Sequence, residues 1–202
     1  MDRRRCLHET IHDDGVNAWT MARIAPPADL SGLIHGYSDY RERTAGFTTR
    51  RELPHAEGVF IVNLGEPISI TGGNGERLTL NAGEAFVAGA HLRPALSHSA
   101  GSQAGIHVFL PLATLRLLLG MPMHEIADRV VPLDAILGRA ARELGDALAA
   151  ADGRDHRIDL LDEALRRRLH GIEPPNGQQH HALRLLRARP DLDISAIATE
   201  IG

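Results

Sequence analysis

The chain has 202 residues, a hydrophobic content of 43% and a formal net charge of −4. A chain of this length can bury one substantial core plus a small appendage, and an aromatic content of only 3% means that this core must be aliphatic. With few rings and no excess of basic residues, the composition disfavours a single-stranded nucleic-acid binder. Cys6 is the single cysteine, which excludes an internal disulfide and fits a reducing compartment. Arg116 interrupts the best apolar run short of the ~18 residues of a membrane span, and no signal-peptide pattern is present, so we expect a cytoplasmic protein without membrane contact.

The first 20 residues are expected to form a polar N-terminal tail, which carries one motif with catalytic chemistry. His8-Glu9-Thr10-Ile11-His12 matches H-E-x-x-H, a spacing that on a helix places two imidazoles on one face for zinc and leaves the glutamate to deprotonate water. Asp13-Asp14-Gly15 follows at once, so the helix would be barely two turns long, and no third ligand is evident. We keep a zinc protease as a minor alternative and favour a tail without a catalytic role.

The segment from about residue 30 to residue 110 predicts a series of short strands. A buried-type apolar run covers residues 59–64, and two alternating segments, 68–71 and 77–80, flank Gly72-Gly73-Asn74-Gly75, a strong hairpin signal. Further strands are predicted at regular spacing, over residues 84–88, 94–98 and 105–110. The pattern indicates a small antiparallel barrel of the jelly-roll type.

Residues 111–170 change to a helical period and complete a domain that we place at residues 21–170. Two apolar stripes predict two antiparallel helices separated by Asp152-Gly153. The stripes consist of Leu137, Ala141, Leu144 and Leu148, and of Ile158, Leu161, Leu165 and Leu169. Packing onto the barrel and formation of a dimer explain these stripes equally well.

The C-terminal segment reads as a linker at residues 171–179 followed by an incomplete helix-turn-helix domain at residues 180–202. One helix ends at Pro190, and Asp193 can cap a second helix because its carboxylate accepts bonds from free first-turn amides. An apolar stripe along this second helix requires another helix to cover it, and a glycine suited to a left-handed turn follows. The stripe and its turn consist of Ile194, Ile197, Ala198, Ile201 and Gly202.

Residues 182–202, A-L-R-L-L-R-A-R-P-D-L-D-I-S-A-I-A-T-E-I-G, resemble the start of the DNA-binding region of the AraC/XylS family of transcription regulators. The upstream chain resembles the same family's barrel-type sensor domain through a series of short segments in matching order and spacing. These segments are L-I-H-G-Y (33–37), R-R-E-L-P (50–54), N-L-G-E-P (63–67), A-F-V-A-G (85–89), L-L-G-M-P (118–122) and V-V-P-L-D (130–134). The resemblance implies a cupin-like barrel that senses a small-molecule effector, and a homodimer formed through the helices beside it.

The family's recognition helix and second helix-turn-helix would lie beyond Gly202, so we expect DNA contact only through such a region and assign no base-reading residue. From Gly171 onward, three arginines face four carboxylates, which gives no basic field for phosphates.

Three residues near the strand that begins at Pro94 are candidates for effector binding because they offer polar groups near an expected barrel rim: His91, Arg93 and His98. A metal-dependent cupin enzyme, with His91, His98 and His107 at the barrel mouth, is the next alternative. No H-x-H pair is present, however, and strand alternation places His107 opposite Ile106 and Val108, which predicts that it faces solvent. We therefore expect a binding module of α+β fold rather than an enzyme, with no catalytic residue, no metal and no cofactor.

Overall fold

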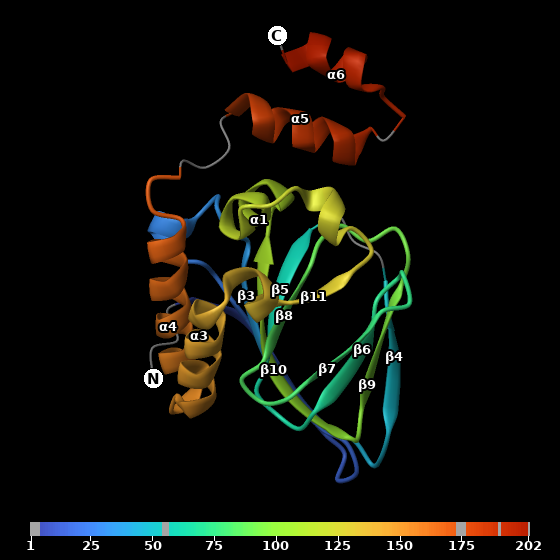
Figure 1. Cartoon of the computed structure of the whole chain (residues 1–202), viewed down its shortest axis with the longest axis vertical. Helices are drawn as coiled ribbons and strands as arrows, with labels where there is room; N and C mark the ends of the chain where they lie inside the picture. Colours follow the sequence, from blue (N-terminus) through green and yellow to red (C-terminus); the bar gives the residue numbers. More distant parts are fainter. Residues whose placement is uncertain (1–4, 54–56, 173–176, 190, 202) are drawn as a thin grey trace. The chain divides into compact units, whose positions relative to one another are not determined.

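The computed structural model describes residues 5–53, 57–172, 177–189 and 191–201. The fold is α+β, as the sequence predicts, and the chain divides into two compact units, Met1–His170 and Gly171–Gly202 (Figure 1). Residues 173–176 of the predicted linker, Pro190 and the predicted turn glycine, Gly202, lie outside the described residues.

Two antiparallel sheets face each other in the first unit and form a jelly-roll-like barrel (Figure 1). The larger sheet has seven strands in the spatial order β1 (Cys6–Asp13), β2 (Ala18–Ile24), β3 (Gly36–Arg43), β10 (Ser102–Leu110), β5 (Gly58–Asn63), β8 (Ala85–Ala88) and β11 (Val130–Pro132). The smaller sheet has four strands in the order β4 (Thr48–Glu52), β9 (Ala95–Ser99), β6 (Ile68–Thr71) and β7 (Arg77–Leu80).

The hairpin predicted around the glycine cluster is present as β6 and β7, which pair from Ile68 opposite Leu80 to Thr71 opposite Arg77. Its turn is closed by the backbone N–H of Gly72, which donates to the carbonyl of Glu76 at 2.8 Å. Alternation along both strands points Ile68, Ile70 and Leu80 into the barrel, where they join the aliphatic core.

The prediction of a polar tail over the first 20 residues is wrong for the described residues, because β1 and β2 form a hairpin within the larger sheet. β1 pairs with β2 from Cys6 opposite Ile24 to Asp13 opposite Ala18, and β2 continues onto β3. The turn between them is held by Asp14, whose carboxylate accepts the backbone N–H groups of Val16 and Asn17. β1 is an edge strand whose residues are mostly exposed, and its polar composition follows from that position.

The described part of the first unit contains four α-helices: α1 (Leu112–Leu119), α2 (Leu133–Leu137), α3 (Arg139–Ala150) and α4 (Gly153–Arg168). Two short 3-10 helices lie at Ala28–Leu30 and Met123–Ile126. The two predicted antiparallel helices correspond to α3 and α4, which contact each other beside the barrel (Figure 1). Their stripes are buried most completely at Leu148 and Leu161, both at 0% exposure. The segment between α1 and α2 was expected to be helical, yet it contributes strand β11, which pairs with β8 and extends the larger sheet.

Helix α4 is fixed to strand β3 by buried polar contacts. The Tyr37 hydroxyl donates to Asp162 at 2.5 Å, and the Arg5 guanidinium donates to both carboxylate oxygens of Asp162. Burial and this hydrogen bond raise the pKa of Tyr37 well above its usual range, so that the phenol keeps its proton.

A second polar contact joins α4 to the next outward-facing residue of β3. Asp39 is buried at 5% exposure, and its carboxylate oxygens lie 3.5 Å from Arg154 Nε and 3.6 Å from Arg157 Nε. Tyr37 and Asp39 therefore point from β3 toward the helices, and the residues between and after them, Ser38 and Tyr40, point to the opposite side of the sheet.

The second unit consists of α5 (Gly177–Ala188) and α6 (Ile194–Ile201), which contact each other. The capping predicted for Asp193 is present, since its carboxylate accepts the backbone N–H of Ala196 at 2.8 Å. Arg189 Nη1 lies 3.5 Å from Glu200 Oε2, and the side-chain amide of Gln178 donates to the backbone carbonyl of Ile201.

The predicted apolar stripe of α6 is only partly covered by described residues. Ile197 is 4% exposed and Ile201 is half-buried, whereas Ile194 is 74% exposed and Ala198 is also exposed. The stripe thus presents apolar surface beyond what α5 covers.

Candidate ligand-binding site

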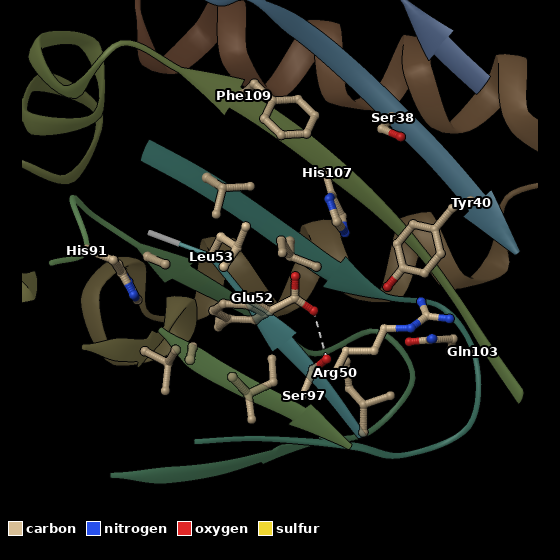
Figure 2. A pocket seen from close by; sticks show the side chains of 18 of the residues that line it. Ser38, Tyr40, Arg50, Glu52, Leu53, His91, Ser97, Gln103, His107 and Phe109 are labelled. Carbon is tan, nitrogen blue, oxygen red and sulfur yellow. Dashed lines mark hydrogen bonds between the residues drawn. The ribbon is translucent and has the colours of Figure 1, made fainter. Parts of the chain in front are cut away.

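A cavity of about 380 Å³ lies between the two sheets of the barrel. It falls within the size range of pockets that bind small organic molecules. Figure 2 shows the side chains that reach into it from β3 and β10 of the larger sheet and from β4 and β9 of the smaller one.

Strand register places a graded row of side chains across the cavity wall formed by the larger sheet. Arg23 pairs with Ser38, Ser38 with His107, His107 with Ile61, and Ile61 with Phe86. All five line the cavity. The row therefore runs from charged and polar residues on β2 and β3 to aliphatic and aromatic residues on β5 and β8.

The smaller sheet repeats this gradient on the opposite wall. Arg50 pairs with Ser97, and Ser97 with Ile70, while Glu52 pairs with Ala95. All five residues line the cavity, which therefore has one polar side and one apolar side.

The apolar side is part of the buried core of the barrel. Besides Phe109, which also borders the polar side, seven cavity-lining residues pack in or against one hydrophobic cluster. They are Val59, Ile61, Ile68, Ile70, Phe86, Ala88 and Val130.

His107 lines the cavity, so the prediction that it faces solvent is wrong. The alternation itself was correct, because Ile106 and Val108 point the other way and are 0% exposed beneath the helices. Both faces of β10 are covered, one by helices and the other by the smaller sheet. Burial, together with the positive charge of Arg23, lowers the pKa of His107 to about 4, so its imidazole is neutral at pH 7.

Tyr40 packs edge-on against His107, with ring centroids 4.8 Å apart. Burial, reinforced by the negative charges of Glu52 and Glu42, raises the pKa of Tyr40 to about 12. Gly105 makes this packing feasible, because a Cβ there would lie 2.9 Å from the Tyr40 hydroxyl oxygen. The phenol and the imidazole thus present two uncharged polar groups to the cavity.

Three charged side chains border the polar side: Arg23, Arg50 and Glu52. Arg50 forms a salt bridge with Glu42, a carboxylate that also accepts the side-chain amide of Gln103 at 2.5 Å. Arg23 lies over the ring of Phe109, with its guanidinium carbon 4.4 Å from the ring centroid. Glu52 accepts the hydroxyl of Ser97 at 2.8 Å, and Figure 2 shows its carboxylate between the two sheets.

The three predicted effector-binding residues do not surround one cavity. His91 lines the cavity at the end opposite Gln103, as Figure 2 shows. Arg93 is exposed in the loop before β9, where its backbone N–H donates to Asp128. His98 follows the cavity-lining Ser97 along β9 and points to the other face, where it bonds to Thr49 and stacks on Phe47. Contact of any of the three with a ligand stays a prediction.

The H-E-x-x-H motif lies on strand β1 rather than on a helix, so the helical premise of the zinc-protease alternative is wrong. Four residues along a strand separate His8 from His12 by about 13 Å, too far for both to bind one metal ion. His8 bonds to Thr10, and His12 stacks on Trp19. Across the part of the chain that the structure describes, no group of three or more His, Cys, Asp or Glu side chains could hold a metal ion. Within that same part, no helix is long and apolar enough to cross a membrane.

Sequence reasoning missed the residues that make the polar side of the cavity, among them Tyr40, Glu52 and Gln103. They come from β3 and β10 of the larger sheet and from β4 of the smaller one, and only strand register and the facing of the two sheets bring them together. Period-2 alternation offered a partial signal, since Ser38 and Tyr40 lie on one face of β3 and Arg50 and Glu52 on one face of β4.

No protein-family model and no curated protein sequence matches this chain. Among solved structures, the AraC-like transcriptional activator CuxR is similar with a TM-score of 0.47 and 13% identity, over 96% of this chain and 76% of CuxR. ToxT K231A from Vibrio cholerae, in its apo form, gives a TM-score of 0.45 and 11% identity, over 82% of this chain and 70% of ToxT. HppE with Fe(II) gives 0.39 and 16%, over 55% of this chain and 58% of HppE, so the chain spans less than two thirds of that protein. At these TM-scores and identities, the similarities assign neither a family nor a function to this chain.

Proposed function

We propose that this chain is the effector-sensing part of an AraC-like transcription regulator, in which a small molecule binds inside the barrel. The observation that carries the proposal is the cavity with one polar and one apolar side. Ligand sites combine apolar walls with a few placed polar groups, which is the arrangement found here. We infer a cytoplasmic location from the unpaired Cys6.

In this proposal α5 and α6 open a helix-turn-helix domain. The support is the sequence resemblance together with the capped α6, whose apolar stripe is left partly uncovered. From Gly171 onward the chain carries three arginines against four carboxylates, so this segment as a whole offers no strong basic field for DNA phosphates.

Helices α3 and α4 form the homodimer interface in the proposed regulator. An apolar groove of about 590 Å³ runs along them. Five half-buried aliphatic residues line it: Leu137, Leu144, Ala147, Leu160 and Ala164. A second copy of the same surface would cover these side chains, as in a two-fold interface.

The dimer is tested by sedimentation of the Leu144→Glu variant, which is expected to lower the average mass to that of a monomer. Leu117→Glu is the matched control, because Leu117 is 48% exposed on α1, outside the groove. Dimerisation that survives Leu144→Glu would remove this groove from the proposal.

The ligand site is tested by a thermal-shift screen of small molecules on the full chain, followed by calorimetry of the compounds that stabilise it. A ligand at 100 times its Kd stabilises the folded state by about 2.7 kcal/mol, which for a chain of this size raises Tm by about 5–10 °C. Ile61→Trp fills the cavity and should abolish the shift, whereas Leu96→Trp, on the outward face of β9, should leave it intact. A shift unaffected by Ile61→Trp would place the ligand elsewhere and refute the proposal.

A further inference from the structure

The polar side of the cavity contains one carboxylate that no basic side chain neutralises. Among the described residues, Glu52 has a single hydrogen-bond partner, the hydroxyl of Ser97 at 2.8 Å, and it forms no salt bridge. Glu52 is exposed at the cavity border, and an ionised carboxylate offers about four acceptor sites, so it can accept further hydrogen bonds from water or from a ligand. The other charged side chains at the cavity border, Arg23 and Arg50, each contact a partner within the protein.

The guanidinium groups at the cavity border are already engaged. Arg50 is paired with Glu42, whose side chain is only 10% exposed, and Arg23 covers the ring of Phe109. His107 carries no charge at pH 7 because burial lowers its pKa to about 4. A cation beside Glu52 therefore meets a carboxylate that, among the described residues, forms no salt bridge, and the neutral imidazole of His107 adds no positive charge; Arg23 keeps its own positive charge over the ring of Phe109.

The remaining surface suits a cation with an apolar body. The rings of Tyr40 and Phe109 border the polar side, and Arg23 over Phe109 shows that one of these rings already accepts a cation on its face. Across the cavity, the aliphatic wall of β5, β6 and β8 would bury a hydrocarbon group of the ligand. A ligand that matches this cavity therefore carries its charge at one end and a hydrocarbon group at the other.

We propose that the cavity binds an organic ammonium ion with an aryl or alkyl body, in which the ammonium group donates to Glu52 and the body packs on Ile61, Ile70 and Phe86. This inference rests on the proposed function, because it names the ligand class of the same cavity. Tyr40 borders the ammonium group, and Ser97 orients the carboxylate.

Three probes with the same body and different heads test the class by calorimetry on the full chain: 2-phenylethylamine, 2-phenylethanol and 3-phenylpropanoate. We expect the amine to bind at least tenfold more tightly than the other two. Glu52→Gln should weaken amine binding at least tenfold without changing the affinity of the alcohol. Glu66→Gln removes a carboxylate from an exposed loop residue outside the cavity and should change neither.

The outcomes separate the ligand class from the proposed function. Tightest binding of the carboxylate, equal binding of amine and alcohol, or an amine affinity unchanged in Glu52→Gln each overturns the ammonium assignment. The ammonium assignment also fails if none of the three probes binds while a screened compound stabilises the wild-type chain and loses this effect in Ile61→Trp. In that case the proposed sensing cavity is retained. If no screened compound is sensitive to Ile61→Trp, the proposed function itself fails.

Discussion

Helix α3 crosses the loop between β7 and β8 at a point where neither segment carries a side chain. A Cβ added at Gly145 would lie 1.9 Å from the backbone carbonyl oxygen of Gly83, whereas ordinary contact begins at 3.4 Å. The obstructing atom belongs to the backbone, so it cannot rotate away as a side chain could. In Gly145→Ala, helix and loop would therefore have to separate by about 1.5 Å, a change comparable to overpacking a core.

The magnitude follows from two opposing terms. Alanine is favoured over glycine within a helix by about 0.5–1 kcal/mol, and overpacking costs about 1–3 kcal/mol. Because the neighbour of Gly145 is rigid backbone, the upper part of that range applies, and the net loss in unfolding free energy is about 2 kcal/mol. For a chain of this length such a loss lowers Tm by about 4–8 °C.

Urea unfolding of the full chain, followed by circular dichroism, measures this loss. Gly46→Ala is the matched control, because no atom lies within 4 Å of a Cβ at that position and its backbone is not left-handed. The control should stay within about 0.5 kcal/mol of the wild type. A Gly145→Ala variant as stable as the wild type, or more stable, would show that the helix and the loop are not in close contact.

Three further predictions concern single side chains. The pKa of His107 is about 4 when folded and 6.5 when unfolded, so as pH falls from 6.5 to 4 the unfolded chain gains a proton that the folded chain does not. Unfolding free energy should therefore decrease over this window in urea titrations, and less steeply in His107→Gln; parallel curves would contradict the cavity position of the imidazole. Tyr37→Phe removes a buried hydrogen bond to Asp162 and should lower the unfolding free energy in urea by about 1.5–3 kcal/mol. The Tyr40 hydroxyl bonds to no described residue, so Tyr40→Phe should lower it less. Equal losses in the two variants would refute this prediction. Asp193, whose pKa is lowered by backbone N–H groups at the start of α6, should stabilise that helix above pH 3.8 and lose this effect as pH falls through its folded pKa. Asp193→Ala should accelerate amide exchange in α6 and Asp193→Asn should not, and equal rates in the two variants would exclude a capping role.

Local signals in the sequence predicted much of the barrel. The glycine cluster before Glu76 can only form a tight turn between two alternating segments, and the apolar run of β5 is buried on both faces as such runs usually are. β1 was not predicted, because an edge strand with one exposed face needs few apolar residues and so leaves little apolar signal in the sequence. Its His8 and His12 matched a helical zinc motif, although neither the backbone nor the spacing supports one.

The candidate site was less predictable, because it depends on long-range register. Local pattern identified the histidines near Pro94, and of these only His91 reaches the cavity. Tyr40 lies in no recognised motif, and Glu52 lies in the R-R-E-L-P segment without being identified as a site residue; their proximity arises from the facing of two sheets. The position of His107 was misjudged because alternation distinguishes two faces of a strand but does not reveal what covers each face.

Strand β3 has no face that tolerates a change of register. Its odd-numbered residues Tyr37 and Asp39 are bonded to α4, and its even-numbered residues Ser38 and Tyr40 line the cavity. A slip of one residue would exchange the two sets: it would carry a carboxylate into the cavity wall and leave the arginines of α4 facing a serine and the ring of a second tyrosine. Contacts on both faces of β3 therefore fix its register, and the shape of the cavity depends on the contacts between β3 and α4.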